Sequence, residues 1–337
     1  LILYQALLLI ARALLFAAFL SRSLLLFVVE AVVEGAAFCF ASGTSSAYLY
    51  ELHGEEGYLA KSTRAGNFST AGFIISTLSY VLIYDSLGLQ GLLAATVISG
   101  AICFTLSFFI EREPQKTRNT GEHAAADTGK PLPFTKNIAA IFKNKHALLF
   151  SCMLSLFGIA WLLVNFFYAD KLIKSNVPIE WLSAIIIAYS AIQMLAEPII
   201  NRAVRPGAKL SRLHLTVLSG IICGAAFAIF GALSSVVLAI SAMLLIPLML
   251  SIPEYLIGEL ENKIIDQLEL KDNRAASLSV MNIGVNLVQV VSLFAASVLT
   301  KIGIGWCFAF CGISIIACSL AMLLNRRKST ADMKEQN

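Results

Sequence analysis

The stretch that decides the fold is residues 215–253, LTVLSGIICGAAFAIFGALSSVVLAISAMLLIPLMLSIP, which runs for 39 positions without an Asp, Glu, Lys or Arg. A helix that crosses the apolar core of a bilayer needs about 20 consecutive apolar residues. The stretch therefore has room for two such helices, and its Gly-Ala-Leu-Ser-Ser sequence at 231–235 supplies a turn between them. Backbone polar groups inside lipid must be bonded within their own segment, so apolar runs of this length predict α-helices.

The same pattern continues on both sides of this stretch. Of the 337 residues, 58% are hydrophobic and 14% are charged, and the mean hydropathy is +0.79. An ordinary soluble domain carries roughly 25% charged residues. Further runs without a charged residue are 65–84, 86–110, 147–169, 275–300 and 302–325. The sequence therefore predicts an all-α polytopic membrane protein.

The apolar runs resolve into ten predicted transmembrane helices. They are 1–20, 24–47, 66–84, 89–110, 147–169, 181–200, 213–230, 235–257, 275–299 and 304–325. The polar, Pro- and charge-rich segment 111–146 is typical of a flexible linker. It separates a first part, 1–110, with four helices from a second part, 147–325, with six, and 326–337 form a polar tail.

The basic residues orient these helices. Twenty of the 25 lie in the loops after the second, fourth, sixth and eighth helices and in the tail. Only Arg22, Lys171, Lys174 and Lys301 lie in the other loops. Basic residues concentrate in cytoplasmic loops. We therefore expect a multi-pass protein of the inner cell membrane with both chain ends and the linker in the cytoplasm.

The sequence lacks the patterns of several function classes. All seven cysteines lie in apolar runs, the four histidines are scattered, and there is neither a nucleotide-binding loop nor a GxSxG motif. We expect no enzyme activity, no cofactor, no metal site and no nucleic-acid partner. The chain begins at Leu1 inside an apolar run without Met or a basic signal region, so we expect a fragment or a processed start.

A short pattern recurs in the two parts. Tyr48-Leu49 and Tyr255-Leu256 stand near predicted cytoplasmic helix ends, and each pair is followed by an acidic loop. Arg64-Ala65 and Arg274-Ala275 then open a span rich in Ser and Asn. Two predicted helices follow each Arg-Ala before the linker or the tail, so the pattern indicates an internal repeat.

This organisation resembles the major facilitator superfamily, whose members join two six-helix halves by a long cytoplasmic loop. The residues that carry the resemblance are Gly35-Ala36-Ala37, Ser42-Gly43-Thr44, Ala47-Tyr48-Leu49-Tyr50, Arg64, the linker and Asn273-Arg274-Ala275-Ala276-Ser277. The resemblance implies a two-half helical bundle in which this chain supplies helices three to twelve. It also implies that the first two helices are absent and that residues 1–110 are an incomplete N-terminal half.

Ionisable residues inside a membrane are costly, so each one is a functional candidate. Glu30 and Glu34 lie within the second predicted helix, and Arg12 lies at a similar depth in the first. Two interpretations of Glu34 stay open: it is a proton-coupling carboxylate, or it is a structural partner of Arg12. Small residues at every fourth position of the same helix, including Gly35 and Gly43, predict a ridge on which another helix packs closely.

Amides and a cluster near the sixth helix complete the candidates. Asn165, Gln193, Asn282 and Asn286 either line a polar pathway or bond between helices. Glu197 is expected to pair with Arg202 or Arg205 as a cytoplasmic latch. The other latch candidates are Arg64, Arg274 and Asn201. The superfamily has a signature loop, and the resemblance implies a degenerate second copy of that loop at residues 201–209, which begins at Asn201.

The resemblance implies a secondary transporter that works by alternating access. We expect proton-coupled export of small, amphipathic or drug-like molecules by a monomer in the bilayer. Solute uptake by the same fold is one alternative, and a truncated membrane protein without transport activity is the other.

Overall fold

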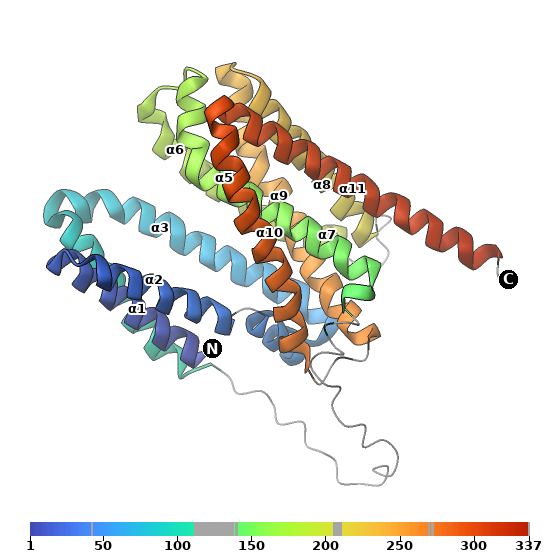
Figure 1. The fold of residues 1–337 in the computed structure, drawn as a ribbon, viewed down its shortest axis with the longest axis horizontal. Coiled ribbons are helices and arrows are strands. Elements are labelled where there is room, and N and C mark those ends of the chain that lie inside the picture. Colours follow the sequence, from blue (N-terminus) through green and yellow to red (C-terminus); the bar gives the residue numbers. More distant parts are fainter. Residues whose placement is uncertain are drawn as a thin grey trace, which may run out of the picture.

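The computed structural model describes the backbone of residues 1–41, 43–110, 138, 141–204, 211–268, 270 and 273–335, and side chains as far as Asn325 apart from Glu56 and Val81. Among these residues the regular elements are helices (Figure 1). They are α1 (Ile2–Ser21), α2 (Leu24–Ala41), α3 (Thr44–Ser107), α5 (Lys145–Lys174), the 3-10 turn η1 (Ile179–Trp181), α6 (Leu182–Gln193), α7 (Ala196–Ala203), α8 (Arg212–Ala232), α9 (Val236–Gln267), α10 (Arg274–Ile302) and α11 (Ile304–Glu335).

Nine helices in the described part of the chain are long and apolar enough to cross a membrane. Each corresponds to one of the ten predicted helices. The tenth, 66–84, lies inside α3 and is not a separate span of this kind. Its sequence is rich in hydroxyl residues, which bond back to their own helix: Thr70 to the Gly66 carbonyl at 3.0 Å and Thr77 to the Phe73 carbonyl at 2.9 Å. The segment is therefore helical but less apolar than its neighbours.

Helix α3 changes direction at two glycines. Gly54 has φ 66° and ψ −177°, and Gly88 has φ 63° and ψ −162°. A side chain opposes positive φ, so glycine is the residue that fits both positions. At Gly88 the chain turns back, and a pocket of about 510 Å³ lies between residues 76–83 and 92–99 of the two resulting segments. The turn lies between the third and fourth predicted helices.

Helices α5 to α11 form the C-terminal group, which contains the main hydrophobic core. Its largest fully buried side chains include Phe157, Phe227, Phe230 and Phe308. Helices α8 and α11 approach so closely that a Cβ on Gly224 would lie 2.5 Å from the Gly312 carbonyl oxygen. Small residues allow such contacts between membrane helices.

Helices α1 to α3 form the N-terminal group, which has few buried side chains. Helix α1 packs on α2 and on the last segment of α3. The buried hydrophobic residues of α1 and α2 are Leu8, Ala11, Ala18 and Ala37. The N-terminal group therefore presents large apolar surfaces outward.

The two groups meet along the first part of α3, which contacts α6, α7, α9 and α10. We call the end of the bundle where α3 finishes and α5 begins the linker end, and the end with the α8–α9 and α10–α11 turns the far end. In Figure 1 the N-terminal group extends to the left from this junction, whereas α9 and α10 extend upward from it. Most of the linker 111–146 lies outside the described residues, and so does Arg205.

Candidate gate and transport pathway

Arg274, at the start of α10, is the centre of a polar network at the linker end. Its side chain is 6% exposed. One guanidinium nitrogen donates to the backbone and side-chain oxygens of Asn262 at 3.1 and 3.2 Å, and the other forms an ion pair with Asp266. The guanidinium carbon lies 4.2 Å from the centroid of the Tyr50 ring, and Nε lies 4.0 Å from the Glu51 carboxylate. Arg274 thus joins α3, α9 and α10.

The same network continues on α3. The Tyr50 hydroxyl donates to Asp266 at 2.9 Å. The Asn262 amide donates to the Ser46 hydroxyl at 3.0 Å, and Ser46 shares a 2.8 Å hydrogen bond with the Tyr58 hydroxyl. Buried charges are stable only when they are paired and hydrogen-bonded. The junction between the two groups therefore supplies the ion-pair and hydrogen-bond partners of the buried Arg274.

A second charge cluster lies beside the first. The Glu259 side chain is fully buried and lies 2.5 Å from Arg212 and 3.2 Å from Lys263. Glu55 of α3 lies 2.8 Å from Lys263 and 3.9 Å from Arg212. Two acidic and two basic side chains thus balance one another, and one of the acids comes from the N-terminal group.

Glu197 has a partner other than the expected arginines. Its carboxylate accepts a 2.5 Å hydrogen bond from the Asn67 amide of α3, which also donates to the Met194 carbonyl at 3.1 Å. Among the described residues Glu197 makes no ion pair with Arg202, and Arg205 lies outside them. Glu197 therefore joins the two groups of helices instead of stabilising its own loop.

Tyr255 and Tyr58 mark direct contacts between α3 and α9. A Cβ on Gly66 of α3 would lie 1.7 Å from the Tyr255 hydroxyl oxygen, so the tyrosine lies directly against the backbone. A Cβ on Gly258 would lie 3.3 Å from the Tyr58 hydroxyl oxygen. The two helices therefore approach closely where the polar networks lie.

The predicted ridge of small residues is in contact at one of its two glycines. A Cβ on Gly43 would lie 2.7 Å from the Ala275 carbonyl oxygen, and Gly43 has φ 74°. A Cβ on Gly35 would have no neighbouring heavy atom within 4 Å. The buried residues of α2 are instead Glu30 and Ala37. The packed face of α2 therefore differs from the ridge that the spacing predicts.

Arg64 and the residues at the end of α7 do not take part in the network. Arg64 is exposed, and its guanidinium lies 5.8 Å from the ring centroid of Phe68 on the same helix. Asn201 and Arg202 are also exposed. Of the latch candidates, the structure brings Arg274 and Glu197 to the junction and leaves these three at its edge.

The charged residues of α1 and α2 are separated in the structure. Glu30 is 7% exposed, whereas Glu34 is exposed. Arg12 donates to the Thr96 carbonyl at 3.4 Å and to the Ser99 hydroxyl at 3.3 Å. Within the described part of the chain, Arg12 forms no ion pair with Glu34. The salt-bridge interpretation of Glu34 therefore has no support in this conformation.

Glu254 is a further candidate site residue, which the sequence analysis did not single out. It lies in α9 after Pro253, and its carboxylate accepts a hydrogen bond from the Trp161 indole at 3.1 Å. Trp161 packs edge-on against Tyr189 with ring centroids 5.9 Å apart. Residue 254 as a whole is exposed. The available signal was that Glu254 is the first charge after the 39-residue apolar run.

The predicted amides lie on three helices: Asn165 in α5, Gln193 in α6, and both Asn282 and Asn286 in α10. Asn165 and Asn286 are exposed, and Gln193 and Asn282 are partly buried. None of the four side chains forms a hydrogen bond with another described residue. Gln289 instead packs against α5, since a Cβ on Gly158 would lie 1.8 Å from its amide nitrogen.

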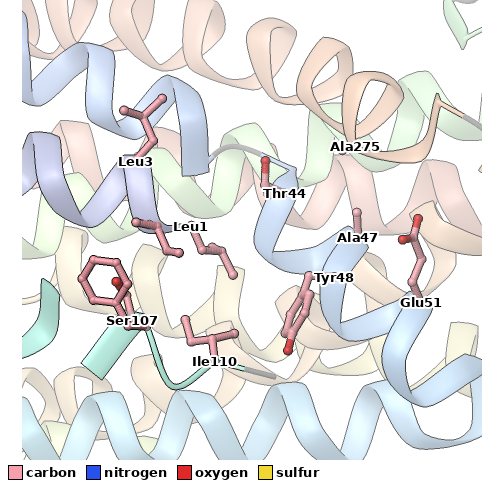
Figure 2. A pocket seen from close by; sticks show the side chains of 11 residues that line it. Leu1, Leu3, Thr44, Ala47, Tyr48, Glu51, Ser107, Ile110 and Ala275 are labelled. Carbon is pink, nitrogen blue, oxygen red and sulfur yellow. The ribbon is translucent and has the colours of Figure 1, made fainter. Parts of the chain in front are cut away.

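A pocket of about 540 Å³ adjoins the Arg274 network (Figure 2). Its lining comes from the starts of α1 and α3, the end of α3 and the start of α10. The residues are Leu1, Ile2, Leu3, Thr44, Ala47, Tyr48, Glu51, Ser107, Phe108, Ile110 and Ala275. Glu51 therefore lies both in this pocket and beside Arg274.

The described residues contain no group of three or more His, Cys, Asp or Glu side chains placed to hold a metal ion. All seven cysteines are free.

Comparisons with known proteins agree with the fold. The family described as Major Facilitator Superfamily matches residues 1–257. The structure is similar to the crystal structure of the fucose:proton symporter FucP of E. coli, with a TM-score of 0.68 and 13% sequence identity over 95% of this chain and 82% of that chain. No curated protein matches the sequence. Because the family match covers most of the chain, this protein belongs to the major facilitator superfamily of membrane transporters.

Proposed function

We propose that this secondary transporter couples proton movement to the export of small amphipathic molecules by alternating access. The observation that carries the proposal is the placement of the polar contacts between the two groups. Those described above all use residues 46–67 of α3, at the linker end. Alternating access requires two bodies that close one end of the pathway at a time. These contacts hold the linker end closed.

Orientation gives this closed end a side. Basic residues concentrate in cytoplasmic loops, so we assign the linker end to the cytoplasmic side of the inner membrane. With this orientation, the proposed state is one closed toward the cytoplasm. A single cysteine at position 125 should be labelled only from the cytoplasmic side, and one at position 175 only from outside. The reverse labelling pattern would overturn the orientation.

The chemistry of the contacts suits a gate that opens. The charged side chains become hydrated when the N-terminal and C-terminal groups of helices separate, so the loss of Coulomb energy is partly offset by solvation. Charge complementarity then fixes which surfaces meet without making the contact permanent. Glu51 and Glu55 on α3 face Arg274, Arg212 and Lys263 of the C-terminal group in this way.

Glu254 is the carboxylate that we assign to proton coupling, with Glu34 of the N-terminal group as the second candidate. An ionisable residue in a membrane helix is a functional candidate by default. Glu254 has an indole donor, Trp161, and this indole packs against Tyr189. Aromatic walls beside a carboxylate suit a molecule with an apolar body and a basic group.

Distance measurements between spin labels test alternating access. One pair, on Lys61 of α3 and Arg202 of α7, reports the linker end, and another, on Tyr84 and Trp181, reports the far end; all four residues are exposed. The exposed Cys39, Cys103 and Cys152 are first replaced by serine. We expect a short linker-end distance and a long far-end distance, and a second population with the opposite change when the pH or a lipophilic cation is varied. Distances that stay fixed under all conditions would favour the alternative of a membrane protein without transport activity.

The direction of transport needs a separate assay. Inverted vesicles energised by a pH gradient should accumulate tetraphenylphosphonium, used here as a lipophilic cation, if the protein is an exporter. Accumulation in right-side-out vesicles would instead support uptake.

A further inference from the structure

A third pocket lies at the far end of the C-terminal group, away from the gate. Its volume is about 440 Å³. It is enclosed by the end of α5, the α8–α9 turn and the α10–α11 turn. The residues that line it are Lys171, Lys174, Gly231, Ala232, Ser234, Gly303, Ile304, Gly305, Trp306 and Ala309. No acidic side chain belongs to this lining.

Lys171 gives the pocket a buried positive charge. It is 5% exposed, and its ammonium donates to the Leu233 carbonyl at 3.1 Å. An ammonium group has three N–H donors. In the described part of the chain neither Lys171 nor Lys174 forms an ion pair with a carboxylate. A buried cation with a single neutral acceptor is incompletely satisfied.

The surrounding backbone adds to the positive potential. Helices α9 and α11 both begin at this pocket, and the start of a helix carries partial positive charge and free N–H groups. The Leu233 carbonyl, at the end of α8, accepts a hydrogen bond from Lys171. Lys301 is exposed two residues before Gly303, and the nearest acids in the sequence, Asp170 and Glu180, are also exposed.

The pocket has a rigid floor. A Cβ on Gly305 would lie 2.4 Å from the Gly231 carbonyl oxygen, so the α8 and α11 backbones touch there. The backbone of the two turns is therefore closely packed, which lowers the entropy cost of ordering it around a ligand.

Trp306 places the pocket at the level of the membrane surface. Its side chain is 56% exposed, and its ring lies 6.2 Å from that of Phe310, which is also exposed. Tryptophan is enriched where membrane helices meet lipid headgroups, and lysine extends its ammonium to the same level. The opening of the pocket is therefore within reach of headgroup phosphates.

We propose that this pocket binds a phosphate oxyanion through Lys171 and Lys174. The phosphate belongs to an anionic lipid headgroup or to a soluble phosphate compound, since the recognising chemistry is the same. The bound anion completes the hydrogen bonds of Lys171 and joins α5 to the two turns. The site is independent of the proposed transport cycle, because its residues differ from those of the gate.

Thermal unfolding of the purified protein in neutral detergent tests this site. The probes are dioctanoyl phosphatidylglycerol and inorganic phosphate, with dioctanoyl phosphatidylcholine and sodium chloride as references at matched concentration and ionic strength. We expect phosphatidylglycerol to raise the Tm of the unaltered protein more than phosphatidylcholine does. A comparable rise with inorganic phosphate would identify a soluble phosphate as a sufficient ligand, whereas a rise with the lipid alone would identify a headgroup site.

Variants distinguish this site from general effects of lipid. Lys174→Glu, at an exposed position, should lower the apparent affinity at least about tenfold, which is about 1.4 kcal/mol, and Lys171→Met should remove the difference between the two lipids. The control is Lys61→Met, which removes another exposed positive charge, at the linker end. An equal response of Lys174→Glu, Lys61→Met and the unaltered protein would overturn the proposal, even if Lys171→Met does not fold. No preference for phosphatidylglycerol and no phosphate effect in the unaltered protein would overturn it as well.

Discussion

The two copies of the Tyr-Leu and Arg-Ala pattern look equivalent in the sequence, but they have different environments in the structure. Arg64 of the first copy is exposed and lies over Phe68 of its own helix. Arg274 of the second copy is buried, and its partners come from α9 and from α3 in the other group. Similar sequences therefore mark similar places in the chain, while the facing helix decides what each arginine does.

The two copies are complementary at the junction. The first copy supplies the acids Glu51 and Glu55, and the second supplies the bases Lys263 and Arg274. Arg212 of α8 adds a further base. An internal repeat can thus provide both sides of a gate if its copies differ in the sign of the charges they present.

The largest expected effect separates the membrane carboxylates of the two groups. Glu254→Gln should keep the fold and substrate exchange but abolish proton-driven transport, because Gln cannot take up and release a proton. Glu34→Gln should reduce transport less, since Glu34 has no hydrogen-bond or ion-pair partner among the described residues. Tetraphenylphosphonium transport in vesicles, with and without a pH gradient, measures both. Unchanged gradient-driven transport in Glu254→Gln would exclude it as the coupling group.

The next largest effect separates the two arginines. Breaking a buried ion pair by removing one partner costs about 3–5 kcal/mol, so Arg274→Ala should lower Tm strongly and shift the linker-end spin-label distances to longer values. Arg64→Ala is the matched control, and its effect on stability should be within about 0.5 kcal/mol as for other surface substitutions. An equal loss of stability in the two variants would show that the buried contacts of Arg274 add nothing to the free energy of unfolding.

Hydropathy predicts where helices lie but not which helix faces which. Nine of the ten helices that it predicts correspond to apolar helices of membrane-spanning length among the described residues, because apolar length reports the preference of a segment for lipid over water. It gave no role to Glu254, because the predicted helix ends at residue 257, only three positions later, whereas α9 continues to Gln267. The sequence also suggested arginines of the following loop as partners of Glu197. It cannot show that Asn67, which is distant in the sequence, is the residue that bonds to Glu197.

The third prediction compares two glycines of the predicted ridge. Gly43→Leu should destabilise the protein by about 1–3 kcal/mol through overpacking, because the new side chain meets the α10 backbone at a position with φ 74°. Gly35→Leu should have little effect, since its Cβ meets open space. Both are measured by thermal unfolding and by expression level. Equal loss in the two variants would show that α2 packs differently in the membrane.

The smallest expected effect concerns the outer edge of the junction. Glu55 and Lys263 form a 2.8 Å ion pair, but their side chains are 56% and 24% exposed. Exposed pairs contribute about 0.2–1 kcal/mol and weaken as salt is added. A double-mutant cycle with Glu55→Ala and Lys263→Ala should therefore give a coupling free energy in this range that falls between low and high salt.

Arg212→Ala provides the comparison for this pair. Its partner Glu259 is fully buried, so the variant removes one of two cations from a carboxylate that water does not reach. Its destabilisation should exceed that of Glu55→Ala and depend less on salt, because buried pairs are screened less than exposed ones. If Glu55→Ala were the more damaging of the two, the junction would depend on its α3 acids more than on the buried carboxylate of α9.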